Sequence, residues 1–520
     1  MIVNKKSIYL LCLIISIGVL ILLTSHFAIE ERRTCAAAPI LTEKEYSCLE
    51  ESDSFDATSF LMQNDHPVAR DTTTNTIYIS IPPLDDLNFW ELPARLSSSH
   101  PEYSLCFAPD QAFEDFRTAV AQNHVFTLLV VRENRFVPYS VVFTTLPVLE
   151  LNAFTLAERH DIHRGSFTLW DSNSSESGYS IASSEAEWHT RGGASKSSAK
   201  PPYKIALKKT ESTENRNLAL LNLGKDDDWI LNSMVFDDLK IREKVVSSFW
   251  NVLQDTMDPT LKTTGSEYVE VLINGTYSGL YLLQRRVDSK FLGSSRADDI
   301  LFKSSDSGSR TSVEAAFLIT SNPNAIEEQL AYQQMLPIYQ AITSSDDLQH
   351  LPNINIDNWI DINILTSAFA AKDNRSYKNM YYLLHKQNDH YVLEFVPWDM
   401  DLTFGLDWNG KVFFNPDVML RTTPYLRLES TTFFKLEPSL EYKLALRWKD
   451  LRSNLLSLDH LTSFIHSLRI PLSESGSLVR DQNKWGLYHN GEDSLESLVN
   501  LLSTHLSLMD TYYQSVLDGG

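Results

Sequence analysis

The sequence has few cysteines, glycines and prolines for its length, and it has no excess of basic charge. Four cysteines in 520 residues, with no C-x-x-C spacing, exclude a disulfide-built scaffold, a thiolate zinc site and a dithiol redox pair. Only 18 Gly and 20 Pro accompany 43% hydrophobic residues, which excludes wholesale disorder. The net charge of −22 disfavours nucleic acid as a partner. The length suggests two or three domains.

One long uncharged run stands near the N-terminus. Residues 8–28 carry no charged side chain and follow Lys5 and Lys6. A helix of about 20 apolar residues crosses a hydrocarbon core of about 30 Å, whereas signal-peptide cores have about 7–15 residues. We therefore expect residues 1–28 to be a cytoplasmic tip and a transmembrane signal anchor, with the bulk of the chain extracytoplasmic. A cleaved signal peptide is the alternative, and it also places the working part outside.

The remaining pattern predicts an α+β protein. Residues 29–70 are polar and of mixed charge, which is typical of a stalk. Residues 71–145 contain alternating β-branched and polar runs and predict a small β-rich region. The serine-rich stretch 172–198 is typical of a flexible loop. Residues 437–517 show helical periodicity that breaks near Pro471.

Two strand pairs are predicted in the second half of the chain. Residues 268–273 and 276–283 flank an Asn-Gly pair, which tolerates positive φ at both positions of a tight hairpin turn. A helix over about 357–371 is followed by strands at 379–384 and 391–396.

The loop between that helix and the next strand carries Asp373 and Asn379. A carboxylate can accept a hydroxyl proton and an amide oxygen can bind a hard cation, so the pair could serve base catalysis beside a metal. The spacing alone is also typical of residues that cap helices and turns.

Two further carboxylates, Asp399 and Asp401, directly follow the last of these strands. Two close carboxylates repel each other unless a cation or hydrogen bonds compensate. Mg²⁺ commonly takes one or two carboxylates together with phosphate oxygens, so this pair is a candidate magnesium site. The alternative is a turn capped by two aspartates.

The stretch 191–207 begins with Arg191-Gly192 and contains Lys196, Lys200 and Lys204. Small residues let backbone N–H groups approach a phosphate, and a lysine can neutralise it. The stretch matches neither a Walker loop nor a dinucleotide fingerprint. The alternative is an ordinary solvated strand.

Taken in order, these segments resemble the CotH family, the spore-coat-protein-H-like atypical protein kinases. The similarity spans about residues 145–515, and we assign residues 146–517 to the CotH kinase-like domain. The matching segments are Leu146-Pro147-Val148, Arg191-Gly192 with Lys200, Tyr203 and Lys204, Asn274-Gly275 with Gly279-Leu280-Tyr281, Asp373 with Asn379-Met380-Tyr381-Tyr382, Pro397-Trp398-Asp399-x-Asp401-x-Thr403-Phe404-Gly405, Arg447-Trp448 with Leu451-Arg452, and Arg480 with Trp485.

The resemblance implies an atypical protein-kinase-like fold and transfer of the ATP γ-phosphoryl group, with Mg²⁺, to Ser or Thr of surface or spore-coat-type proteins. By this analogy Asp373 is the catalytic base. The metal ligands would be Asn379, Asp399 and Asp401, and the cofactor-binding residues would be Arg191, Gly192, Lys200 and Lys204. The acidic net charge favours a basic, Lys-rich acceptor. The expected partners are therefore this protein substrate and a membrane, with no nucleic acid.

Two positions depart from the family's pattern. Gly193 stands where relatives usually have Asn, and Arg285 stands where they usually have Glu. A catalytically degenerate surface scaffold or adhesin is therefore an alternative to an active kinase. A third hypothesis is a nucleotide-sugar transferase that uses Asp399-x-Asp401 as its metal motif, although no nucleotide-binding α/β half accompanies it.

Overall fold

The computed structural model describes residues 38–52, 61–63, 66–83, 96–109, 115–156, 162–172, 180–293, 296, 298–304, 311–322, 328–343, 353–371, 373–374, 379–388, 390–407, 412, 439–487 and 493–519. Within these ranges, no helix combines the length and apolar character that a membrane crossing requires. The anchor predicted at residues 1–28 lies outside the described residues.

The N-terminal region is β-rich, as predicted, and is built on a sheet in the order β4-β5-β9-β8-β7, with β1 added to β9. These strands are β1 (Glu50–Glu51), β4 (Ala69–Asp71), β5 (Thr76–Ser80), β7 (Ser104–Phe107), β8 (Phe126–Arg132) and β9 (Arg135–Thr144). A short helix, α2 (Glu43–Tyr46), precedes β1. Helix α3 (Phe116–Ala121) packs on the sheet, and β2 (Leu61–Gln63), β3 (His66–Pro67) and β6 (Leu96–Ser98) form a smaller sheet.

The described part of residues 29–70 does not form the expected stalk. Ala38, Leu61 and Val68 are buried in the core of the N-terminal region, and β1 and β4 pair with its strands. The apolar residues scattered through this polar stretch are therefore enough to fold it onto the sheet.

A closed seven-stranded barrel follows, in the order β10-β11-β12-β13-β16-β18-β17. Its strands are β10 (Val148–Leu156), β11 (His163–Asp171), β12 (Ser180–Thr190), β13 (Tyr203–Lys208), β16 (Asp228–Asn232), β17 (Ser266–Ile273) and β18 (Thr276–Arg285), and a two-stranded sheet of β14 (Leu218–Ala219) and β15 (Lys225–Asp226) flanks it. Strand β12 corrects the prediction of a loop at 172–198, because its Ala186 and Trp188 alternate inward into the barrel core despite the serines around them.

The predicted Asn-Gly hairpin is confirmed as β17–β18, with φ of 51° at Asn274 and 65° at Gly275. The N-terminal region contacts this turn. The Tyr277 backbone N–H donates to the Asp71 carboxylate at 2.9 Å, and the Thr72 N–H donates to the Gly275 carbonyl at 2.8 Å. The barrel and the N-terminal region are thus joined by one backbone–backbone hydrogen bond and one bond from a backbone N–H to a side-chain carboxylate.

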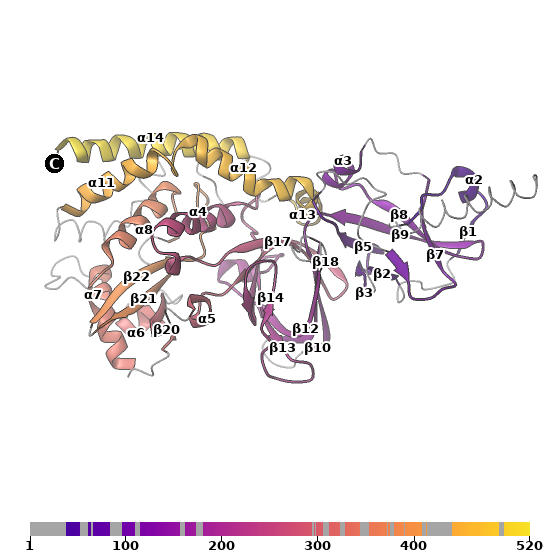
Figure 1. Ribbon diagram of the computed structural model, residues 1–520, viewed down its shortest axis with the longest axis horizontal. Coiled ribbons are helices and arrows are strands. Elements are labelled where there is room, and N and C mark those ends of the chain that lie inside the picture. Colours follow the sequence, from indigo (N-terminus) through magenta and orange to yellow (C-terminus); the bar gives the residue numbers. More distant parts are fainter. Residues whose placement is uncertain are drawn as a thin grey trace, which may run out of the picture.

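The C-terminal half combines a second sheet with helices (Figure 1). The sheet has the order β20-β19-β21-β22, with β19 (Ile300–Ser304), β20 (Phe317–Ser321), β21 (Met380–Gln387) and β22 (His390–Pro397). The helices are α4 (Arg242–Thr256), α5 (Ser289–Leu292), α6 (Val313–Ala316), α7 (Glu328–Thr343), α8 (Ile356–Ala368), α11 (Ser439–Arg452), α12 (Leu458–Glu474), α13 (Ser477–Trp485) and α14 (Leu495–Gly519), with 3-10 turns η3 (Ala194–Ser197) and η4 (Pro259–Leu261). One hydrophobic core joins this sheet to α4, α8, α11, α12 and α14.

The predicted α+β class with a helical C-terminal part is confirmed, but the helix break lies elsewhere. Pro471 sits inside α12, which continues to Glu474. The chain turns at Gly476, whose φ is 68°, before α13 begins. A proline near a helix end removes one donor without ending the helix, whereas the left-handed glycine does end it.

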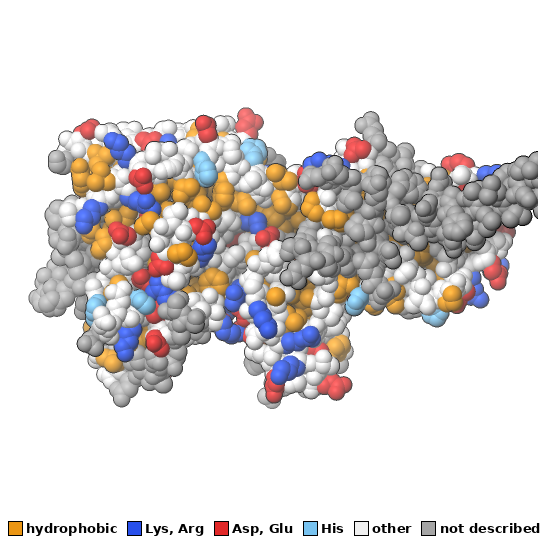
Figure 2. Space-filling view, viewed as in Figure 1, with side chains coloured by type: hydrophobic (Ala, Val, Ile, Leu, Met, Phe, Trp, Pro, Cys, Tyr) orange, Lys and Arg blue, Asp and Glu red, His pale blue; other side chains and the backbone are white. Residues whose placement is uncertain are grey.

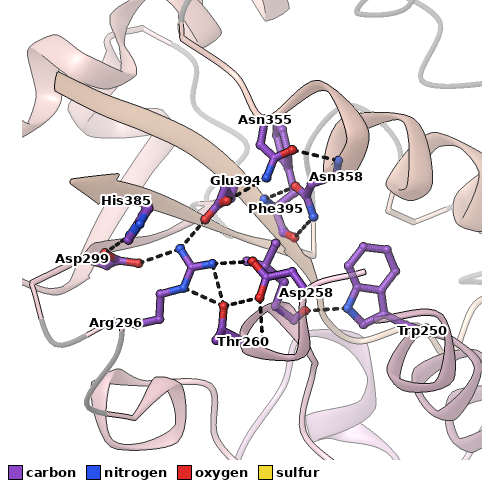
Figure 3. Close-up of polar contacts among 11 residues, drawn as sticks. Trp250, Asp258, Thr260, Arg296, Asp299, Asn355, Asn358, His385, Glu394 and Phe395 are labelled. Atoms are coloured by element: carbon purple, nitrogen blue, oxygen red, sulfur yellow. Dashed lines mark hydrogen bonds and ion pairs between the residues drawn. The ribbon is translucent and has the colours of Figure 1, made fainter. Parts of the chain in front are cut away.

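A buried charge cluster centred on Arg296 fixes the second sheet to the segment that follows α4 (Figure 3). Arg296 donates to Asp258 at 2.9 Å and to Glu394 on β22. The other oxygen of Glu394 accepts from Asn355, the residue that caps α8, at 2.8 Å. Because breaking a buried ion pair leaves an uncompensated charge, this cluster stabilises the connection between β22, α8 and the segment after α4.

Candidate functional site

A cavity of about 230 Å³ opens between the barrel and the second sheet. From the barrel side it is lined by Arg191, Gly192, Gly193, Ser195, Pro202, Asn232, Ser233, Val235 and Phe236. From the sheet side it is lined by Lys303, Asp373, Asn379, Asp399, Asp401 and Leu402. Six of the eight residues singled out from the sequence therefore meet in one place, although more than 200 positions separate the first from the last.

Strand pairing brings the acidic and amide residues together. Strands β21 and β22 are antiparallel, and Met380 pairs with Pro397 at their shared end. Asn379, which precedes β21, therefore lies beside the residues that follow β22. Asn374 fixes this junction, because its side-chain amide donates to the carbonyls of both Asn379 and Trp398 at 2.9 Å.

The side chains of Asp373 and Asn379 contact each other directly. The Asn379 Nδ2 donates to the Asp373 Oδ2 at 2.8 Å, so Oδ1 is the end of the amide that remains for a cation. Asn379 and Asp399 both adopt positive φ, 51° and 58°. Such left-handed non-glycine residues cost free energy and cluster where a site requires a particular side-chain direction.

The cavity has an excess of negative charge. Burial, followed by the charges of Asp399, Glu243 and Asp373, raises the pKa of Asp401 well above its ordinary value. Burial and the Asp399 charge raise the pKa of Glu243, in the first turn of α4, to about 8, while the Met400 N–H and Arg191 oppose this shift. The Glu243 Oε2 is buried and accepts no hydrogen bond from the described residues. This set of carboxylates is therefore stabilised by an added cation.

The donor set fits a magnesium ion that is shared with phosphate. Among the residues the structure describes, no group of three or more His, Cys, Asp or Glu side chains is arranged to hold a metal by itself. Three aspartates, Asp373, Asp399 and Asp401, line the cavity together with the Asn379 amide instead. Mg²⁺ is typically bound by one or two carboxylates together with waters and substrate phosphates, so Asp399, Asp401 and Asn379 would hold it with the help of a ligand.

Two cations face these acids. Arg191 precedes η3, and Lys303 lies on β19, so they come from opposite sides of the cavity. Neither the Arg191 guanidinium nor the Lys303 ammonium has a hydrogen-bond or ion-pair partner among the described residues. Unpaired cations beside a carboxylate pair suit a ligand with several phosphates.

The two lysines predicted to contact phosphate do not line the cavity. The Lys200 side chain is 1% exposed, and its ammonium is held by Asp481 at 2.6 Å. Lys204 lies on the outer face of β13, because Ile205 and Leu207 occupy the inward positions, and it contacts Asp228 at 3.4 Å. The cavity's cations are Arg191, as predicted, and Lys303, which the sequence analysis missed.

Lys303 and Glu243 carry no local sequence signal, since each lies within an ordinary strand or helix pattern. Lys303 comes to the site only because β19 pairs with β21. The departure at Arg285 also proves to be remote from the cavity, because this side chain donates to the buried Asp226 at 2.9 Å. The replacement of the family's usual Glu by Arg285 therefore takes no side chain away from the cavity wall.

The comparisons with known proteins agree with this geometry. None of the curated proteins matches the sequence. The family described as CotH kinase protein matches residues 188–509, a range that contains every residue lining the cavity. This match covers more than half of the sequence, and the chain therefore belongs to the CotH kinase family.

Proposed function

We propose that this chain is an extracytoplasmic, membrane-anchored atypical kinase that transfers the γ-phosphoryl group of ATP to Ser or Thr of a protein, with Mg²⁺. Membership of the CotH kinase family implies a kinase-like transferase. The observation that carries the finer proposal is the composition of one cavity. It combines a candidate base, oxygen ligands for a cation, and two cations that have no partner among the described residues.

In this proposal Asp373 is the general base. Its carboxylate accepts the proton of the acceptor hydroxyl while the Asn379 amide holds it in place. The hydroxyl oxygen forms a bond to the γ-phosphorus, and the bond from phosphorus to the departing ADP oxygen breaks. Phosphoryl transfer needs little covalent chemistry from the protein, so positioning and charge neutralisation are its main contributions.

The remaining residues bind and neutralise the nucleotide phosphates. Arg191 and Lys303 would contact phosphate oxygens from opposite sides, and the exposed Gly192 and Gly193 let the backbone approach. Asp399, Asp401 and Asn379 would hold the magnesium. When bound, this ion neutralises charge that develops on the transferred group.

The membrane anchor and the acceptor are part of the same proposal. The uncharged run at residues 8–28 supports an anchor with the kinase outside. The net charge of −22 favours a basic acceptor segment. Figure 2 shows both signs of charge on the face in view, so this preference would depend on the surface around the cavity rather than on the whole molecule.

The test is transfer of labelled γ-phosphate by the full chain, to itself or to Ser- and Thr-containing peptides, with Mg²⁺. We expect label on Ser or Thr with the unchanged chain and a loss of about 10²-fold or more with Asp373→Asn, which keeps the shape of the side chain. The melting temperature of the variant should stay close to that of the unchanged chain.

Two outcomes would redirect the proposal. Mg-ATP binding without any transfer favours a binding-only surface scaffold. Binding of a UDP-sugar in preference to ATP favours a nucleotide-sugar transferase.

A further inference from the structure

Helix α13 carries a buried carboxylate, Asp481, which does not line the cavity but contacts β18 and Lys200. Figure 1 shows α13 at the junction of α12, the barrel strands β17 and β18, and the N-terminal region. Asp481 accepts the Leu280 backbone N–H of β18 at 2.9 Å. Gly279 makes room for it: its φ is 103°, and a side-chain carbon there would approach the Asp481 oxygen to 2.4 Å.

Asp481 holds the first of two segments that line the cavity through Lys200. Their ion pair is 2.6 Å long, and both side chains are almost fully buried. Lys200 lies three residues after the end of η3, and the Arg191 N–H donates to the Pro202 carbonyl at 2.9 Å. The loop 191–202 is therefore closed at its base by this backbone bond and fixed near its end by the ion pair.

The second lining segment is held through Lys240. The other Asp481 oxygen lies 3.6 Å from the Lys240 ammonium, which donates to the Met234 carbonyl at 2.9 Å. Residues 232–236 surround Met234 and form the neighbouring part of the cavity wall. One carboxylate thus connects to both barrel-side segments of the cavity.

We propose that Asp481 is a positioning residue that holds loop 191–202 and segment 232–236 in place through Lys200 and Lys240, so that Arg191 and the glycines after it face the nucleotide. This inference rests on the proposed function for the identity of the ligand. The positioning role itself does not depend on the identity of the ligand. Removing one member of a buried ion pair leaves the other charge without a partner, and the residue that carries this charge then moves.

The test compares amide hydrogen exchange of the ligand-free full chain in Asp481→Asn, Lys200→Met and a control. Asp481→Asn should speed exchange in both 191–202 and 232–236, whereas Lys200→Met should speed it only in 191–202. The matched control is Asp510→Asn, which removes an ion pair to Arg452 elsewhere in the C-terminal helices and should change neither segment. Both site variants should also bind Mg-ATP about tenfold more weakly than the control.

Unchanged exchange in both segments of a folded Asp481→Asn variant would overturn the proposal. An equal increase in exchange throughout the barrel strands would also overturn it, because such an increase indicates general destabilisation. If Asp481→Asn does not fold, Lys200→Met decides: normal exchange in 191–202 overturns the proposal. If the unchanged chain does not bind Mg-ATP but Asp481→Asn speeds exchange in both segments, the anchoring role is supported and the nucleotide function is refuted.

Discussion

The side-chain amide of Asn379 donates a hydrogen bond of 2.8 Å to the carboxylate of Asp373, six residues earlier in the chain. The bond fixes the direction of the carboxylate and turns the amide oxygen of Asn379 away from it. One asparagine therefore orients the candidate base and contributes a candidate metal ligand, which links the two functions through a single side chain.

Substitution of Asn379 should affect the transfer rate, whereas substitution of the nearby Asn374 should affect the stability of the fold. We expect Asn379→Ala to lower the transfer rate by about 10²-fold with little change in melting temperature, because it removes an orienting group from a cavity. Asn374→Ala should lower the free energy of unfolding by about 1–3 kcal/mol, because two backbone carbonyls lose a buried donor. Enzyme assays paired with thermal melts would check both, and a destabilised Asn379→Ala with proportionate activity loss would contradict the distinction.

Removing the charge of Asp401 should stabilise the ligand-free chain. Its raised pKa means that, at neutral pH, the folded state disfavours the carboxylate more than the unfolded state does. Asp401→Asn should therefore raise the melting temperature by a few degrees, about the size expected for 1 kcal/mol. The same variant should lose the additional stabilisation that Mg²⁺ and ATP give together. A lower melting temperature without ligand would show that Asp401 is structural.

The structure favours Lys303 as the lysine that contacts phosphate, whereas the sequence analysis favoured Lys200 or Lys204. Substitutions of Lys303 and Lys204 distinguish the two predictions. Lys303→Met should weaken ATP binding about tenfold, because a cation is lost from the cavity wall. Lys204→Met is the matched control, since this lysine lies on the outer barrel face beside Asp228. Isothermal titration of both variants with Mg-ATP provides the measurement. A larger effect from Lys204 would restore its predicted role in phosphate binding.

The buried His505 of α14 should make stability depend on pH. Burial lowers its pKa below 6.5, partly opposed by the hydrogen bond in which Nε2 donates to the Ser367 carbonyl at 2.7 Å. Below pH 6.5 the unfolded chain binds a proton that the folded chain resists at this site, so the contribution of His505 to stability falls with decreasing pH by up to about 1.4 kcal/mol per pH unit.

Replacing this histidine should remove that dependence. In urea unfolding, lowering the pH from 7 to 5 should change the free energy of unfolding of His505→Gln in a more favourable direction than that of the unchanged chain. His460→Gln, on the exposed side of α12, is the control and should keep the slope. An unchanged slope in His505→Gln would exclude this residue as its source.

The sequence predicted those parts of the fold that depend on local pattern. The Asn-Gly hairpin, the strands around residues 380–397 and the C-terminal helices have turn chemistry or periodicity that needs no distant partner. Strand β12 was missed because its serines are typical of loops, and only the barrel around it buries Ala186 and Trp188. Tertiary context thus overrode local composition.

The sequence allowed us to predict which kinds of side chain form the candidate site. It did not allow us to predict every residue that lines it. Asp399 and Asp401 follow a strand, so their place at its end could be inferred. The roles of Lys200 and Lys303 could not, because both depend on contacts between distant segments: Lys200 with Asp481 of α13, and β19 with β21. The resemblance to relatives pointed to the loop that lines the cavity, but not to Lys303, the lysine that lines it.

The most direct test of the central claim is isothermal titration of the full chain with ATP, with Mg²⁺ and with both, repeated on the double variant Asp399→Asn/Asp401→Asn. We predict that Mg²⁺ tightens ATP binding at least about tenfold in the unchanged chain and has no effect in the double variant. Equal ATP affinity with and without Mg²⁺, or a magnesium effect that survives the double substitution, would contradict the account.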